Sequence, residues 1–115
     1  MMLNVSFACH MPDCLEMPYK PAIIGMHDPV GKETAWYMGG NSCLAGDYVG
    51  AWAFDNNHWP QVGDLVIFRD MIHYTMVKTT MFNGVTHPSI VTYHSQRGFE
   101  TIRRFGYKDY KVRMG

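Results

Sequence analysis

Residues 59–77 read WPQVGDLVIFRDMIHYTMV, and the predicted fold is built outward from this stretch. The pair Gly63-Asp64 is typical of a turn, and the apolar run Leu65–Phe68 after it predicts a short buried strand. A second strand is predicted over Ile72–Thr80, with His73 near its start. Strands this close in sequence usually pair antiparallel, so the stretch predicts a sheet that holds His73 rigidly. We expect a positive φ at the glycine of the turn and capping of backbone amides by its aspartate.

Length and composition indicate one globular domain. The chain has 115 residues, 47% of them hydrophobic and 17% charged, which predicts a single domain over residues 1–115 with one core. Its ten basic and ten acidic side chains cancel, so charge gives no indication of binding to nucleic acid or a membrane surface. Three cysteines, an odd number, argue against a closed disulfide framework. No apolar run approaches transmembrane length, and the N-terminal residues do not resemble a signal peptide. The oligomeric state is left open.

The remaining sequence predicts an α+β fold. Residues 43–54 carry an apolar stripe at helical spacing after a capping Asn41 or Ser42, which predicts the one main helix. Further strands are predicted over residues 3–8, 89–94, 99–104 and 107–112, a helical turn over 32–38, and a hairpin turn at Asn83-Gly84. Together these elements predict one main helix packed on an antiparallel β-meander or a partly open barrel.

Cys43, His73 and His94 form the first candidate site. At the start of a predicted helix, free amides and the helix dipole would favour the thiolate of Cys43 and could serve as an oxyanion hole. A nucleophilic cysteine needs a neighbouring base, which His73 could supply, and His94 could orient that base. Asn41 or Asn83 could take the orienting role instead. In the structural alternative, Cys43 is a small buried side chain and the histidines are only hydrogen-bonded.

The order of these residues resembles that of the NlpC-type cell-wall cysteine peptidases and the related CHAP amidases. In that family a Pro-x-Gly-Asp-Leu-Val-Phe-Phe run precedes a strand that begins with the catalytic histidine, and residues 61–68 and 73–77 stand in those places. The run Val91–Ser95 is similar to the family's next strand, which carries the third polar residue. The resemblance covers residue 40 to about residue 104. It implies a small papain-like domain without a cofactor, with Cys43 as nucleophile, His73 as general base and His94 as the orienting residue.

The function implied by this resemblance is cysteine-dependent hydrolysis of an amide bond by an endopeptidase or amidase. The implied substrate is a peptide or a peptidoglycan stem. The chain would then be cytoplasmic as synthesised and reach the cell wall through another delivery system. We also expect iodoacetamide to label Cys43 before the other thiols, at a rate that depends on His73.

Two other functions stay open. Cys9, His10 and Cys14 lie close together in sequence and could supply two or three ligands for zinc or copper, with Cys43 or a distant histidine completing the shell. Alternatively, the chain is a non-enzymatic, β-rich binding or inhibitor protein of phage or bacterial origin that docks on a partner through its aromatic surface.

Overall fold

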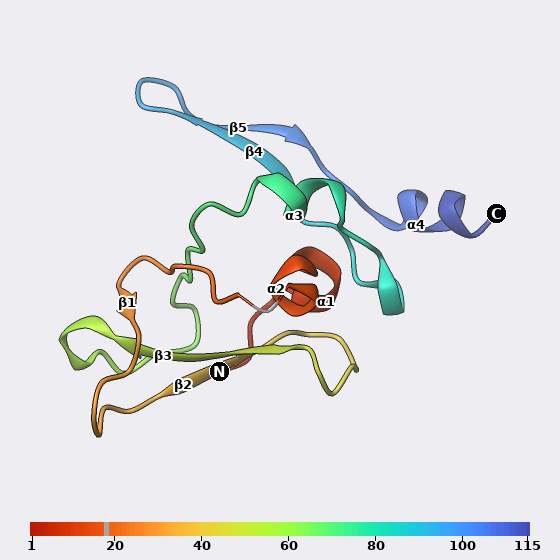
Figure 1. Ribbon diagram of the computed structural model, residues 1–115. Helices are drawn as coiled ribbons and strands as arrows, with labels where there is room; N and C mark the ends of the chain where they lie inside the picture. The colour runs from red at the N-terminus through yellow and green to blue at the C-terminus, as the bar shows by residue number, and fades with distance from the viewer. Residues whose placement is uncertain (18) are drawn as a thin grey trace.

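The computed structural model describes residues 1–17 and 19–115, which form short helices and antiparallel strands (Figure 1). In chain order the elements are α1 (Phe7–His10), α2 (Asp13–Glu16), β1 (Met26–His27), β2 (Trp36–Gly39), β3 (Tyr48–Phe54), the 3-10 helix η1 (Asp55–Asn57), α3 (His73–Val77), the 3-10 helix η2 (Phe82–Gly84), β4 (Ile90–His94), β5 (Gly98–Arg103) and α4 (Tyr107–Met114). The strands make two sheets, one in the order β1-β3-β2 and one of β4 and β5 alone. The prediction of a single meander or barrel is therefore wrong.

Strand β3 is the centre of the three-stranded sheet. It pairs antiparallel with β1, where Met26 lies opposite Phe54, and with β2, where Trp36 lies opposite Trp52. The helix predicted over residues 43–54 is wrong. Its apolar stripe also suits a strand buried in the middle of a sheet, and glycines at 46 and 50 disfavour a helix. At Gly50 a Cβ atom would overlap the ring of Tyr37 on β2, so this glycine allows the two strands to approach.

The core lies between this sheet and the N-terminal helices, which cross one face of it (Figure 1). The buried members of this core are Phe7, Met11, Cys14, Ile23, Met38 and Trp52. Ser6 caps α1 by accepting a hydrogen bond from the Cys9 N–H at 3.0 Å, which fixes the helix that carries Phe7. Phe68 packs edge-on against Phe7 and Trp52, and its ring centroid lies 5.8 and 6.3 Å from theirs. Phe68 therefore brings the stretch of residues 59–77 into contact with the core.

Residues 59–77 form less β-sheet than their sequence predicts. Phe68 makes an isolated bridge with Ile23, while Leu65 is 87% exposed, so the predicted buried strand over residues 65–68 is wrong. The turn before it is confirmed, because Gly63 has a φ of 102° and the Asp64 carboxylate accepts the Gln61 N–H at 2.8 Å. That bond and a second one from His58 hold the pKa of Asp64 below its usual range.

Residues 72–114 contain two helices in place of predicted strands. The segment predicted as a strand over 72–80 forms α3, in which Thr75 is the buried residue, and the strand predicted over 107–112 is α4. The predicted strands at 89–94 and 99–104 are confirmed as β4 and β5. Asn83 and Gly84 have positive φ values of 58° and 74°, as a turn requires, but they lie in η2 and do not join two strands. Two predictions for the N-terminal part are also wrong. The end of the helical turn predicted over 32–38 belongs to β2, and the end of the strand predicted over 3–8 belongs to α1.

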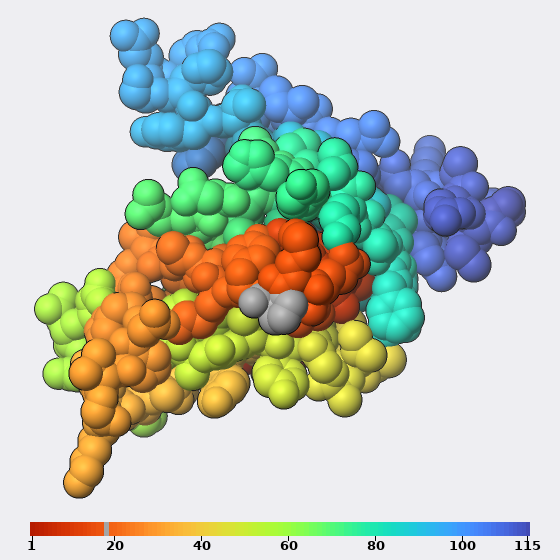
Figure 2. Space-filling view, in the orientation of Figure 1, coloured from red at the N-terminus to blue at the C-terminus, as the bar shows by residue number. Residues whose placement is uncertain are grey.

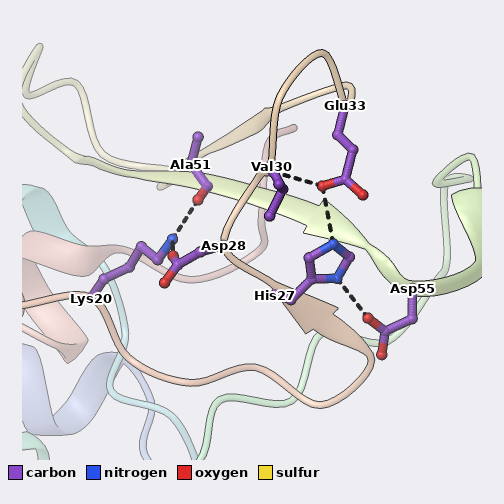
Figure 3. Close-up of polar contacts among 7 residues, drawn as sticks. All are labelled: Lys20, His27, Asp28, Val30, Glu33, Ala51 and Asp55. Atoms are coloured by element: carbon purple, nitrogen blue, oxygen red, sulfur yellow. Dashed lines mark hydrogen bonds and ion pairs between the residues drawn. The ribbon is translucent and has the colours of Figure 1, made fainter.

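Polar contacts fasten β1 to the centre of the sheet (Figure 3). The His27 ring lies between two carboxylates, with its Nδ1 2.7 Å from Asp55 Oδ1 and its Nε2 3.1 Å from Glu33 Oε2. Lys20 contacts Asp28 and donates to the Ala51 carbonyl at 2.6 Å. These contacts join the segment around β1 to β3 and to Asp55, the residue that follows β3.

The β4-β5 hairpin stands out from the rest of the molecule in both views (Figures 1 and 2). Within residues 1–17 and 19–115, none of the helices combines the length and the hydropathy of a membrane-spanning segment.

Candidate functional site

Cys43 lies on a loop over residues 40–47, not at the start of a helix as predicted. The loop is closed at its base, where the Gly40 N–H donates to the Asp47 carbonyl at 2.7 Å. At Gly40 a Cβ atom would overlap the Asp47 carboxylate, so a side chain at this position is excluded. The result is a short, tied loop that places the Cys43 thiol at the protein surface.

Asp47 is the buried anchor of this loop. Its carboxylate accepts hydrogen bonds from the Ala8 N–H at 2.9 Å, the Ser42 N–H at 3.1 Å and the Ser42 hydroxyl at 2.6 Å. Burial by itself raises the pKa of Asp47, but these donors together outweigh it, and the pKa lies below its usual range. The charged form therefore holds the loop to the start of α1.

The partner of the Cys43 thiol is Asn83, whose side-chain amide Nδ2 donates to the sulfur at 2.9 Å. Asn83 reaches it from η2, which is itself held to α1, because Thr80 N–H donates to the Cys9 carbonyl at 2.9 Å and the Cys9 thiol donates to the Phe82 carbonyl at 3.5 Å. Two segments 40 residues apart thus meet at the thiol. The sequence offered Asn83 only as an orienting residue for a histidine, and the Asn-Gly pair is the signal that placed it in a tight turn.

His73 and His94 are held elsewhere. His73 is the first residue of α3 and is exposed, and in the described part of the chain no hydrogen bond joins it to Cys43. His94 ends β4, where its Nε2 lies 3.0 Å from Nη2 of Arg97 in the hairpin turn. Among the described residues, Cys43 is therefore hydrogen-bonded to Asn83 and to neither of the predicted histidines.

Cys9, His10 and Cys14 are buried against the core. Nδ1 of His10 accepts the Ser6 N–H at 3.2 Å, so Nε2 carries the proton and donates to the Thr86 carbonyl at 3.0 Å. Both ring nitrogens are thus used, and burial lowers the pKa of His10. Burial likewise raises the pKa of the Cys14 thiol. Among the residues that the structure describes, no three His, Cys, Asp or Glu side chains are grouped so as to hold a metal ion.

Comparisons with known proteins point to another class of enzyme. No family model matches the chain. It is 56% identical over 114 residues to carboxyaminopropylagmatine decarboxylase from Synechocystis sp., an alignment that covers 99% of this chain and 29% of that enzyme. The similarity is to decarboxylases. A second relative, carboxynorspermidine/carboxyspermidine decarboxylase from Campylobacter jejuni, is 38% identical over 96% of the chain and 31% of its own length.

A solved structure agrees with these relatives. The crystal structure of carboxynorspermidine decarboxylase from Campylobacter jejuni, complexed with norspermidine, superposes with a TM-score of 0.88 at 35% identity. The superposition covers 97% of this chain and 33% of the enzyme chain. The chain therefore spans about a third of the length of the decarboxylases that it matches.

These findings correct the functional predictions. The resemblance to NlpC-type and CHAP cysteine peptidases is wrong, and so are the predicted amide hydrolysis and the predicted peptide or peptidoglycan substrate, because close sequence and structural similarity over nearly the whole chain leads to decarboxylases. The two alternative predictions, a non-enzymatic binding or inhibitor protein and a metal-binding protein, are not supported by these similarities either. The Gly-Asp turn, the apolar run and the histidine after it form a pattern that an unrelated fold also contains.

Proposed function

We propose that this chain forms part of a decarboxylase that acts on a carboxylated polyamine, of the kind named for its relatives: carboxyaminopropylagmatine or carboxynorspermidine. The observation that carries the proposal is the 56% identity over 99% of the chain. The agreement of the backbone with a decarboxylase at a TM-score of 0.88 is consistent with it. Because the chain spans about a third of these enzymes, the reaction belongs to the larger protein of which this chain is one part.

Cys43 is the residue that we assign to the chemistry. Decarboxylation breaks a C–C bond to release CO2, and the carbon left behind takes up a proton in its place. A positioned acid that supplies this proton speeds such a step by about 10²–10⁴-fold. Cys43 offers an exposed S–H on a tied loop, and Asn83 fixes the direction of its sulfur. Cys9 and Cys14 are buried and unsuited to that role.

The electron pair released with CO2 needs an acceptor, and pyridoxal phosphate bound to a lysine supplies one in many decarboxylases of amino acids. Two lysines of this chain do not fit that role, since the Lys20 ammonium pairs with Asp28 and the Lys78 ammonium pairs with Glu16. A lysine that forms a Schiff base must present its amine to the cofactor, whereas both of these side chains are engaged by a carboxylate of this chain. We expect the Schiff-base lysine to be neither Lys20 nor Lys78.

The test is a chimera in which this chain replaces the matched 114 residues of the Synechocystis decarboxylase. Release of CO2 from carboxyaminopropylagmatine and from carboxynorspermidine is then measured. We expect turnover of at least one of them, and a fall of about 10²–10⁴-fold in kcat for Cys43→Ala. Cys9→Ser, a buried thiol, serves as the control and should keep most of the activity. A folded chimera that releases CO2 from neither substrate would overturn the proposal.

A further inference from the structure

Four aromatic rings gather where β3 ends and η1 begins, those of Trp36, Phe54, His58 and Trp59, which we call the ring cluster. The centroid of the Trp36 ring lies 6.3 Å from that of Phe54 and 4.9 Å from that of Trp59, with interplanar angles of 82° and 81°. The Phe54 ring in turn lies 5.4 Å from the His58 ring. Rings that stand nearly at right angles turn their faces in more than one direction, which parallel stacked rings do not.

The ring cluster lines a cavity of about 160 Å³, and Glu33, Thr34 and Asn57 line it as well. Sites for drug-sized molecules measure about 300–1,000 Å³, so this cavity has room for one small chemical group. The lining side chains are open to solvent, because Trp59 is 63% exposed and the Glu33 side chain 37% exposed. A solute can therefore reach both the ring faces and the carboxylate.

Glu33 brings a negative charge to this cavity. Its Oε2 accepts the Val30 N–H at 2.8 Å and lies 3.1 Å from Nε2 of His27 (Figure 3). These contacts lower the pKa of Glu33, so its carboxylate is charged at neutral pH. Among the described residues, the hydrogen bonds of this carboxylate involve Oε2 and leave Oε1 open, and no lysine or arginine lines the cavity.

The faces of the clustered rings are also open to a cation. Elsewhere in the chain, cationic side chains lie over the rings of Trp52, Tyr74 and Phe105, at 5.1, 6.0 and 4.7 Å from the ring centroids. In the described structure no lysine or arginine is placed in this way over a ring of the cluster. Aromatic faces attract cations because the π-electrons make the face negative, and the indole of tryptophan attracts them most strongly.

A tight turn holds the ring cluster in place. Asn56 and Asn57 have φ values of 57° and 52°, in the left-handed region that asparagine adopts more readily than most residues. This turn brings the His58 ring back onto Phe54 and leads directly into Trp59. Groups that are already held in position lose little freedom when a ligand binds, which favours affinity for a small ligand.

We propose that the ring cluster and Glu33 bind a primary ammonium group, the end of a polyamine. The ammonium lies against the indole faces and donates one hydrogen bond to Oε1 of Glu33. The Thr34 hydroxyl and the side-chain oxygen of Asn57, which also line the cavity, accept its other two hydrogens. That the amine is a polyamine rests on the proposed function, whereas binding of an ammonium group rests on the cavity alone.

This site is separate from the thiol of Cys43. The ring cluster lies beyond Phe54 at one end of β3, and the 40–47 loop precedes Tyr48 at the other end (Figure 1). The six steps between these two residues, at about 3.3 Å each, place the ends of the strand about 20 Å apart.

The first test follows the indole N–H signals of the three tryptophans by NMR during titration of the 115-residue chain with propylammonium. The signals of Trp36 and Trp59 should shift with a Kd of about 1–10 mM. The signal of Trp52, which is 2% exposed, should not. The matched control ligand is 1-propanol, which keeps the carbon chain, lacks the charge and should bind about tenfold more weakly. Absence of a shift with propylammonium, or equal shifts with 1-propanol, overturns the proposal.

The second test uses matched variants of the ring and of the carboxylate. Trp59→Leu should weaken propylammonium binding about tenfold, while Trp59→Phe keeps a ring face and should stay within about threefold of wild type. Glu33→Gln should weaken binding about fivefold. Asp55→Asn is its control, because Asp55 also contacts His27 but does not line the cavity, and this variant should stay within about twofold. Wild-type affinity in either Trp59→Leu or Glu33→Gln overturns the proposal.

The third test identifies the amine. Norspermidine carries the ammonium group at both ends, so it should bind at least about twofold more tightly than propylammonium. Nα-acetyl-lysine amide presents the same group as a peptide does, and tighter binding of this compound than of norspermidine would overturn the assignment to a polyamine. Repeating the norspermidine titration with the decarboxylase chimera shows whether the cavity is open in the longer enzyme. Loss of binding there overturns the proposal.

The ammonium site and the proposed function fail separately. A chimera that releases no CO2 but binds propylammonium at the ring cluster overturns the function and leaves the site. A chimera that releases CO2 without this binding does the reverse. Because the cavity lies apart from Cys43, Trp59→Leu should leave kcat of the chimera within about twofold. A fall as large as that of Cys43→Ala would place the ring cluster in the reaction site and overturn a separate one.

Discussion

At the scale of single residues, the three thiols differ in access to solvent. Cys43 is exposed and contacts Asn83, whereas Cys9 and Cys14 are buried. Iodoacetamide should therefore label Cys43 well before the others in the native protein, as mass spectrometry of the labelled peptides can show. Because the described contacts of the sulfur involve Asn83, we expect Asn83→Ala to slow labelling several-fold by removing a donor to the charged sulfur, while His73→Ala leaves the rate unchanged. A large effect of His73→Ala would restore the histidine dependence expected from the sequence.

Asp47 is the one carboxylate in the sequence of the 40–47 loop, and its removal should destabilise the protein. Three donors face it, so Asp47→Ala should lower the free energy of unfolding by about 2–4 kcal/mol at pH 7. The folded-state pKa is lowered, so this stability is present above the ordinary value of 3.8 and is lost as pH falls through the folded-state pKa. Urea unfolding of wild type and variant at pH 7 and pH 3 measures the difference. An equal difference at both pH values would mean that the charge of Asp47 contributes nothing.

At the scale of the elements, the turn at Gly63-Asp64 requires a glycine backbone conformation at its first residue. With a φ of 102°, Gly63 lies where a side chain is strained, although no atom lies within 4 Å of a Cβ built there. Gly63→Val should therefore destabilise the protein by about 1–3 kcal/mol. Gly46→Val is a matched control, since that glycine also faces open space but lacks a positive φ. Equal melting temperatures for the two variants would show that the turn relaxes without cost.

The success at Gly63 and the failures elsewhere have one physical explanation. Turn chemistry is local, so Gly63-Asp64 and the alternating strands around residue 97 could be predicted from adjacent residues alone. Whether residues 48–54 or 73–77 form a strand or a helix depends on burial by distant segments: Trp52 is covered by Phe68, and Thr75 lies among segments 5–11 and 87–91. The Cys43–Asn83 contact joins two loops, and no periodicity in either sequence encodes such a pairing.

The contact between β1 and η1 should respond to pH through His27. The hydrogen bond to Asp55, followed by the one to Glu33, raises the pKa of His27, and the Val30 N–H, followed by His27, lowers the pKa of Glu33. The histidine contribution is complete below pH 6.5 and is lost as pH rises through the raised pKa, whereas the Glu33 contribution is complete above pH 4.5 and is lost on acidification. The melting-temperature difference between wild type and His27→Gln should thus be largest from pH 4.5 to 6.5 and vanish at alkaline pH. His94→Gln, whose ring contacts an arginine, should show no maximum there.

At the scale of the whole molecule, stability should be uneven. Each of the buried hydrophobic side chains in the described structure lies in the N-terminal 53 residues, on α1, α2, β2, β3 or the connecting segments. By contrast, β4 and β5 contain no fully buried residue. The radius of gyration is 15.5 Å, above the roughly 13 Å of a compact domain of this length, in keeping with a hairpin that extends from the body.

Hydrogen exchange of the free chain should reveal this difference. An isolated two-stranded hairpin is marginally stable in water, so the hydrogen-bonded amides of β4 and β5 should exchange at least ~100-fold faster than those of β3, a gap of about 2.7 kcal/mol. The hydrogen-bonded amides of β2 are the internal control, because they belong to the sheet that carries the core and should follow β3. Mass spectrometry of peptides from residues 36–54 and 90–103 measures both sets in one sample. Equal protection in the two sheets would mean that the hairpin is as stable within this chain as the sheet that carries the core.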